Sequence, residues 1–201
     1  LAYLADHDLN IRLSISFSPD GGLDFHKFGE EGRGETIYRV SAENMPALLA
    51  AKYQKVIRFT ADNRSLILYD AQNRDKAALV SLDVETGAIK LLAKDDRVDI
   101  GGVLFDPVDQ VPQAYASNYK RTTWTALEDE LVDDFEALGS LQQGDWKVLS
   151  RSDDKSIWVV QYMAANKPIE FYLYDSNDKR GTRMFSSTPQ LEGLRLSDMH
   201  P

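Results

Sequence analysis

The chain has 201 residues, a formal net charge of -9 at pH 7, 43% hydrophobic and 27% charged residues, and no cysteine. The acidic balance argues against a nucleic-acid partner, whose phosphates need a basic face, and the lack of cysteine excludes disulfides and thiolate chemistry. No apolar run approaches the roughly 20 residues of a membrane-spanning helix, so the composition predicts a soluble globular protein and leaves its compartment, cytoplasm or periplasm, open.

The first clear pattern is an alternation of apolar and polar residues over residues 10–18, followed by a Pro-Asp-Gly turn. Alternation with a period of two indicates a half-buried strand. The same order of strand, acidic turn and strand recurs three times along the chain. The acids that mark the four turns are Asp20, Asp62, Asp106 and Asp153. Subtracting residue numbers gives spacings of 42, 44 and 47.

Two of these units match over a longer stretch. Residues 65–69 and 78–83 in one unit correspond to residues 156–160 and 171–175 in the other, and a turn with glycine follows in both. A four-stranded unit that repeats every roughly 40 to 50 residues is typical of a β-propeller blade. The alternative is a β-sandwich with coincidental spacing. We therefore predict an all-β fold, a partial β-propeller of about four four-stranded blades.

One short inserted helix is predicted near residues 127–138, where four large apolar residues recur at helical spacing and the remainder is rich in acids. Gly139 suits the position after a helix, and Thr125 with Glu128 matches a capping box. With that box the preceding strand ends at Thr125 rather than at Leu127, and the pattern leaves this choice open.

Two earlier segments have mixed signals. Residues 42–52 have a helical composition, yet the repeat places a strand near Leu48 and Leu49. Residues 29–34 contain three glycines but also two acids, which would repel phosphate. A hairpin loop is therefore expected there rather than a phosphate-binding loop.

Several stretches carry a family resemblance by their order and spacing. They are residues 75–83, 103–107 and 112–124, Asp134 with Phe135, and residues 150–153 with Trp158. They resemble the propeller of bacterial serine peptidases of the prolyl oligopeptidase and acylaminoacyl peptidase family, over roughly residues 10–201. The resemblance implies a propeller that precedes an α/β-hydrolase domain.

That resemblance also implies a domain organisation. Residues 1–190 would form a partial propeller, and residues 191–201 would form an exit linker toward a C-terminal hydrolase domain beyond Pro201. Whether the blades close into a ring stays open. An incomplete ring would expose blade faces and favour self-association.

The chain itself offers no catalytic set. It contains no Gly-x-Ser-x-Gly nucleophile elbow, and its histidines are His7, His26 and His200. We therefore expect no catalytic residues and no enzyme activity in this chain, whereas the parent protein would be a serine peptidase. No cofactor and no metal site are expected, because the acids at residues 6–8, 95–99 and 175–178 suit turns better than ligand sets.

Tyr119, Lys120 and Arg121 are the candidate substrate contacts, because an aromatic residue beside two cations suits a peptide; salt bridges on the blade surface are the alternative. The resemblance implies that the propeller gates and positions peptide substrates for the hydrolase domain. A stand-alone propeller that binds a protein or peptide is the alternative. A metal-dependent enzyme built on the loop acids is a third, weaker hypothesis.

Overall fold

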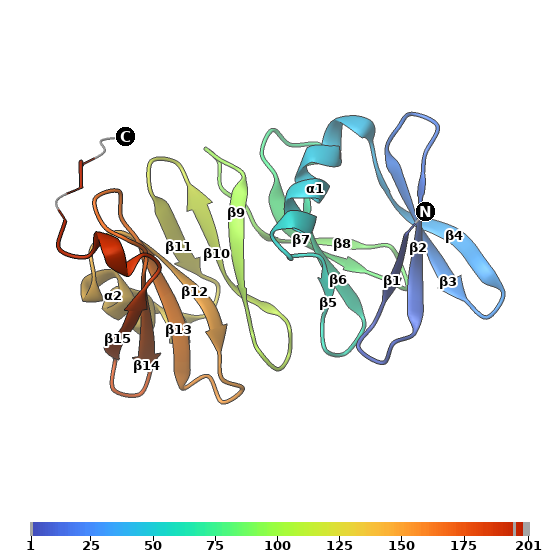
Figure 1. Ribbon diagram of the computed structural model, residues 1–201. Coiled ribbons are helices and arrows are strands. Elements are labelled where there is room, and N and C mark those ends of the chain that lie inside the picture. Colours follow the sequence, from blue (N-terminus) through green and yellow to red (C-terminus); the bar gives the residue numbers. More distant parts are fainter. Residues whose placement is uncertain (1, 195, 199–201) are drawn as a thin grey trace. The chain divides into compact units, whose positions relative to one another are not determined.

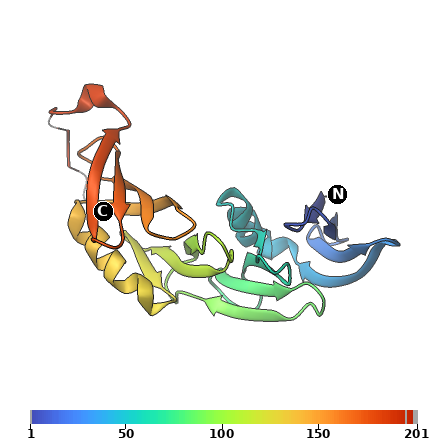
Figure 2. The ribbon, with the colours of Figure 1, turned by 90° about the horizontal axis from the view of Figure 1, so that it is seen from below.

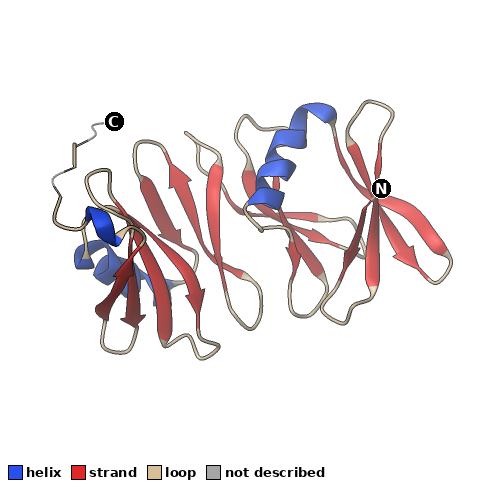
Figure 3. Ribbon diagram, in the orientation of Figure 1, coloured by secondary structure: helices blue, strands red, loops and turns tan. Residues whose placement is uncertain are grey.

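Antiparallel strands are the main secondary structure of the computed structural model, which describes residues 2–194 and 196–198 (Figure 3). The strands form four sheets, three with four strands and one with three. By its internal contacts the chain divides into two units: unit 1 is Leu1–Val103 with Asp109–Val111, and unit 2 is Leu104–Val108 with Pro112–Pro201. Within the described residues no helix is long and apolar enough to cross a membrane. The predicted all-β, propeller-type fold is confirmed.

Unit 1 contains the first two sheets and a helix (Figure 1). The first sheet consists of β1 (Ala2–Ala5), β2 (Ile11–Phe17), β3 (Leu23–Gly29) and β4 (Gly32–Val40). A 3-10 turn (Ala42–Asn44) and α1 (Met45–Tyr53) lead to the second sheet, β5 (Arg58–Phe59), β6 (Ser65–Asp70), β7 (Ala78–Asp83) and β8 (Ile89–Ala93). Neighbours in the chain pair antiparallel, as in a propeller blade. The ambiguous segment 42–52 is therefore helical, and residues 29–34 form a hairpin in which Gly29 pairs with Gly32.

Unit 2 contains most of the third sheet and all of the fourth. The third sheet consists of β9 (Ile100–Phe105), through which the unit boundary passes, β10 (Pro112–Asn118) and β11 (Thr122–Ala126). A 3-10 turn (Asp129–Leu131) and α2 (Val132–Leu141) follow. The fourth sheet is β12 (Asp145–Arg151), β13 (Ile157–Met163), β14 (Glu170–Asp175) and β15 (Arg180–Ser186). Buried side chains of α2, which is yellow in Figure 2, share a core with this sheet.

The inserted helix is present but lies later in the chain than predicted. α2 begins at Val132 and ends at Leu141, so Gly139 lies inside the helix rather than after it. The predicted capping box does not form, because Thr125 stays in β11 and no side chain caps the 3-10 turn. The Glu128 carboxylate instead accepts a hydrogen bond from Gln113 Nε2 at 2.6 Å.

One turn recurs after the first strand of every sheet, and it corrects the predicted register. An oxygen-bearing residue follows each strand, at Asp6, Thr60, Asp106 and Ser152. A left-handed residue follows three or four positions later, at Leu9, Asn63, Gln110 and Lys155. Subtracting the numbers of the first set gives spacings of 54, 46 and 46. The connection between the first two sheets is longer because it holds α1.

Two of the four acids that marked the predicted repeat, Asp20 and Asp153, are not the equivalent residues of this recurring turn. Asp20 follows β2, the second strand of its sheet, because the short strand β1 carries a weaker alternation than β2. In the fourth sheet the acid that organises the turn is Asp154 rather than Asp153. Asp154 Oδ1 accepts from the Ser156 backbone N–H at 3.1 Å, and Ser152 Oγ donates to the same oxygen.

Each unit has its own hydrophobic core, and each core includes a buried tyrosine that donates to a buried carboxylate. In unit 1, Tyr38 Oη donates to Asp70 Oδ1 at 2.7 Å. In unit 2, Tyr174 Oη donates to Asp134 Oδ1 at 2.7 Å. Burial, together with the carboxylate partner, raises the pKa of both phenols well above the usual tyrosine range. Both tyrosines are therefore neutral donors at physiological pH.

Candidate functional site

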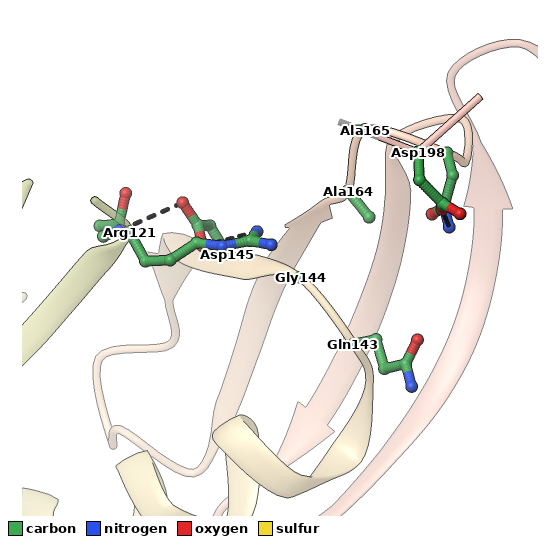
Figure 4. A pocket seen from close by; sticks show the side chains of 9 residues that line it. Arg121, Gln143, Gly144, Asp145, Ala164, Ala165 and Asp198 are labelled. Carbon is green, nitrogen blue, oxygen red and sulfur yellow. Dashed lines mark hydrogen bonds and ion pairs between the residues drawn. The ribbon is translucent and has the colours of Figure 1, made fainter. Parts of the chain in front are cut away.

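Unit 2 contains an open, polar pocket of about 510 Å³ (Figure 4). Three connections border it: the β10–β11 loop, the turn between α2 and β12, and the β13–β14 loop. The lining residues are Arg121, Thr122, Gln143, Gly144, Asp145, Ala164, Ala165, Asn166 and Asp198. The pocket therefore gathers loop ends that lie far apart in the sequence.

Asp145 organises one side of this pocket. Its Oδ2 accepts the backbone N–H of Thr122 at 3.1 Å, and its Oδ1 lies 3.6 Å from Arg121 Nη1. The Arg121 side chain is 61% exposed, against 24% for Asp145. A guanidinium held by one long contact keeps most of its five N–H donors available to a ligand carboxylate or carbonyl.

Gly144 lets the chain turn sharply from α2 into β12. Its φ is +117°, and a Cβ at this position would lie 2.3 Å from the carbonyl oxygen of Met163. Only glycine accommodates both the backbone conformation and this close approach. The turn thereby brings Asp145 next to the β10–β11 loop.

Gln142 joins the same turn to the fourth sheet. Its Nε2 donates to Glu170 Oε2 and to Tyr172 Oη, each at 3.0 Å. Its Oε1 accepts from Lys167 Nζ at 3.2 Å and from the Gln143 backbone N–H at 2.9 Å. All the hydrogen-bonding groups of this side chain are therefore used to hold the turn, and the neighbouring pocket wall is fixed.

On the opposite wall, Asn166 Nδ2 donates a hydrogen bond to Asp198 Oδ1 at 2.6 Å. Among the described residues, the pocket therefore presents one cation, two carboxylates and amide groups. Such a set can bind the backbone and the charged ends of a peptide. It is suited to recognition rather than to covalent chemistry.

The three predicted contact residues lie in one loop but differ in their relation to the pocket. Tyr119, Lys120 and Arg121 form the β10–β11 loop, and of these Arg121 lines the pocket. Tyr119 is 59% exposed and Lys120 is exposed. Sequence reasoning missed Asp145, although an aspartate directly after a glycine turn was a usable signal.

The remaining pocket residues could not be found from the sequence. Asn166 and Asp198 are 32 positions apart, and the sequence has no pattern that pairs them. Asp198 also lies in the segment 191–201 that was predicted to be a linker. Of that segment, Arg195, Met199, His200 and Pro201 lie outside the described residues.

Two of the three histidines, His7 and His26, belong to unit 1. His7 Nε2 contacts the Phe59 carbonyl oxygen at 3.1 Å. His26 lies between the hydroxyls of Ser16 and Thr36, each at 2.9 Å. The second partner of His26 is therefore the Thr36 hydroxyl, whereas a Ser-His-Asp triad needs a carboxylate at that position. His200 lies outside the described residues.

The acidic loops considered as metal ligands serve their own turns. Asp6 Oδ1 accepts the backbone N–H groups of Asp8 and Asn10 at 3.0 and 2.9 Å. Asp95 and Asp175 likewise accept N–H groups two and three residues ahead. These are Asx turns, in which a short carboxylate replaces a backbone acceptor.

Comparison with known proteins gives close relatives but no matching family model. Over 199 residues the chain is 32% identical to Dipeptidyl aminopeptidase BIII of Pseudoxanthomonas mexicana, which covers 99% of this chain and 28% of that protein. It is 26% identical over 199 residues to Dipeptidyl peptidase family member 6 of Caenorhabditis elegans, with 97% and 27% covered. The chain thus spans little more than a quarter of the length of these relatives.

Among solved structures, TolB from Acinetobacter baumannii matches with a TM-score of 0.51 at 14% identity, over 92% of this chain and 43% of TolB. That likeness concerns the propeller fold alone. The sequence likeness to the two dipeptidyl peptidases covers nearly every residue. The chain is therefore a relative of the dipeptidyl peptidases, and its resemblance to the propeller of the prolyl oligopeptidase family of serine peptidases is confirmed.

Proposed function

We propose that the chain is the non-catalytic propeller portion of a serine peptidase, which admits and positions peptides for an α/β-hydrolase domain. The observation that carries this proposal is the 32% identity to a dipeptidyl aminopeptidase over 199 residues. In this proposal residues 1–190 form the propeller portion and residues 191–201 lead to the catalytic domain. The nucleophile, acid and histidine of the reaction belong to that domain.

Within this portion we assign the peptide contact to the pocket around Arg121. Its exposed guanidinium can pair with a peptide carboxylate or donate to a peptide carbonyl. Asp145 and Asp198 supply acceptors for a peptide amine or N–H. Lys120 and Tyr119 are exposed in the same β10–β11 loop, where they can contact a longer peptide.

The first test separates binding from catalysis. The isolated chain is incubated with a chromogenic dipeptidyl anilide, and no turnover is expected, because the hydrolytic groups are assigned elsewhere. Turnover that survives repurification would contradict the non-catalytic role. Retained Arg121-dependent peptide binding with no catalytic domain in the source gene would instead indicate a stand-alone binding module.

The second test uses the full-length product of the source gene. Arg121→Ala is expected to raise KM for peptide substrates by about 3- to 10-fold with kcat unchanged, as for loss of one exposed charged contact. Arg33→Ala is the matched control, because Arg33 is exposed and forms no ion pair among the described residues. Equal KM values for both variants would contradict the assigned contact.

A further inference from the structure

The third sheet lacks the outer strand that the other sheets possess. In those sheets the third strand is followed by a fourth, at β4, β8 and β15. After β11 the chain instead enters the 3-10 turn and α2. The strand order β11-β10-β9 leaves β11 as the outer strand, and none of the described strands pairs with its free edge.

The register identifies which backbone groups of β11 face this free edge. Leu127 N–H donates to the Gln113 carbonyl oxygen at 2.8 Å, which places residue 127 in a hydrogen-bonded pair with β10. Such pairs alternate along an antiparallel ladder. The N–H and C=O groups of Thr122, Trp124 and Ala126 therefore point away from β10. The Thr122 N–H is taken by Asp145, which leaves Trp124 and Ala126 at the edge.

A shallow groove of about 520 Å³ runs beside β11 and α2. Half-buried aromatic rings lie along it. The ring centroids of Trp124 and Trp146 are 5.8 Å apart, and those of Phe135 and Trp146 are 5.1 Å apart. The groove can therefore receive apolar side chains on the face of β11 that carries Trp124.

The outer strands of the other sheets carry charges, which protect a sheet edge from pairing. β4 contains Arg33, Glu35 and Arg39, β8 contains Lys90, and β15 contains Arg180 and Arg183. β11 reads Thr-Thr-Trp-Thr-Ala and carries no charge. This edge is therefore the least protected outer edge of the four sheets.

The charges around the groove indicate the kind of partner. Glu136 lines it and is exposed, and it forms no ion pair within the described part of the chain. Asp133, on the same helix, is likewise exposed and unpaired there. We propose that an extended peptide segment with apolar residues alternating toward the groove, and a Lys or Arg beside Glu136, pairs with β11 as the fourth strand of the third sheet.

A second copy of this chain fits the edge less well. Each copy would bring Glu136, Asp133 and a net charge of -9 to the same interface. Like charges brought together at an interface oppose association. A basic partner removes that cost, and it gains both the ladder hydrogen bonds and the contact with the aromatic rings. The groove shares Thr122 with the Arg121 pocket, but this inference does not depend on the proposed function.

The probe is the hexapeptide acetyl-Thr-Val-Thr-Val-Thr-Lys-amide, titrated into the full chain and followed by amide NMR and hydrogen exchange. The expected pairing is antiparallel, as for β4, β8 and β15. Opposite residues of an antiparallel ladder share a face, so the valines that face Trp124 are also those whose N–H groups point at β11. N-methylation of both valines should abolish binding. N-methylation of the second and third threonines should leave the affinity within about twofold, because those N–H groups point away.

The role of the Glu136 charge is tested by changing the peptide lysine and the protein together. Replacing the peptide lysine by glutamate should weaken binding about 2- to 5-fold, the range of an exposed ion pair. Glu136→Gln should remove most of that discrimination, and Glu31→Gln, at the exposed β3–β4 turn, should leave it unchanged. Slower exchange of the Trp124 and Ala126 amides on binding is the expected signature.

Two results would overturn the proposal. The first is equal binding by the two N-methylated peptides, which would mean that no ladder forms at this edge. The second is protection of the Trp124 and Ala126 amides by concentration-dependent dimerisation without peptide, which would assign the edge to a second copy.

Discussion

Asp134 joins a helix, a strand and a turn in unit 2 through one carboxylate oxygen. Its Oδ1 accepts from Tyr174 Oη at 2.7 Å and from Lys179 Nζ at 2.6 Å, and the residue is 5% exposed. Asp134→Ala leaves a buried phenol and an ammonium without their acceptor. We expect it to lower the free energy of unfolding by about 2–4 kcal/mol.

Tryptophan fluorescence during urea unfolding measures this change, because Trp124, Trp146 and Trp158 all lie in unit 2. Asp153→Ala is the control: that side chain is exposed, and its removal should change stability by less than about 0.5 kcal/mol. Similar losses for the two variants would show that the Asp134 contacts contribute little.

Single residues were also where sequence reasoning was weakest. Arg121 was singled out because a cation beside an aromatic residue is a visible signal, and its contact with a peptide stays a prediction. Asp145 and Asn166 were not, because their roles depend on which loops meet in space. The Asx turns were foreseeable, since an Asp followed by polar residues needs no tertiary partner to close a turn.

At the scale of elements, Gly139 distinguishes the predicted helix from the observed one. A glycine after a helix adopts a left-handed conformation, and alanine there costs stability. In the structure Gly139 lies inside α2, and a Cβ would meet nothing within 4 Å. We therefore expect Gly139→Ala to raise the free energy of unfolding by about 0.5–1 kcal/mol, the helix-interior difference between the two residues.

Gly87 is the matched comparison, because the same substitution there is expected to change stability in the opposite direction. It lies in the β7–β8 turn at φ +72°, and a Cβ would come within 2.5 Å of the Ile37 carbonyl oxygen. Gly87→Ala should lower stability by about 1–3 kcal/mol. Thermal unfolding of the two variants gives both signs, and a destabilised Gly139→Ala would support the earlier helix end.

The elements that the sequence predicted well are those whose pattern is local. β7 matches its predicted range 78–83, and β6 extends the predicted range 65–69 by one residue, because continuous apolar runs bounded by turns belong to buried strands. The start of α2 was misplaced because Glu128 bonds Gln113, a residue 15 positions earlier in the chain. In the first repeat, the marker turn was placed one strand too late along the chain, because β1 has four residues and little alternation.

For the whole molecule, the repeat was the most informative feature of the sequence. A spacing of 46 residues between equivalent turns, at Thr60, Asp106 and Ser152, follows from one sheet for each repeat, with α2 in place of a fourth strand in the third sheet. The resemblance to the peptidase propellers followed from the order of several short stretches. Chemistry could not follow from either, since a fold hosts many functions and its sites lie in the loops.

The two cores give the last prediction. Leu68 in unit 1 and Leu138 in unit 2 are both 0% exposed, and they belong to different hydrophobic clusters. Each Leu→Ala change should cost about 2–5 kcal/mol through lost burial and the cavity that remains. Since the clusters share no residue, we expect the faster amide exchange to stay within the unit that carries the change. Exchange measured by mass spectrometry on peptides from β5–β8 and β12–β15 checks this, and an equal rise in both sets for either variant would mean that the chain unfolds as a single cooperative body.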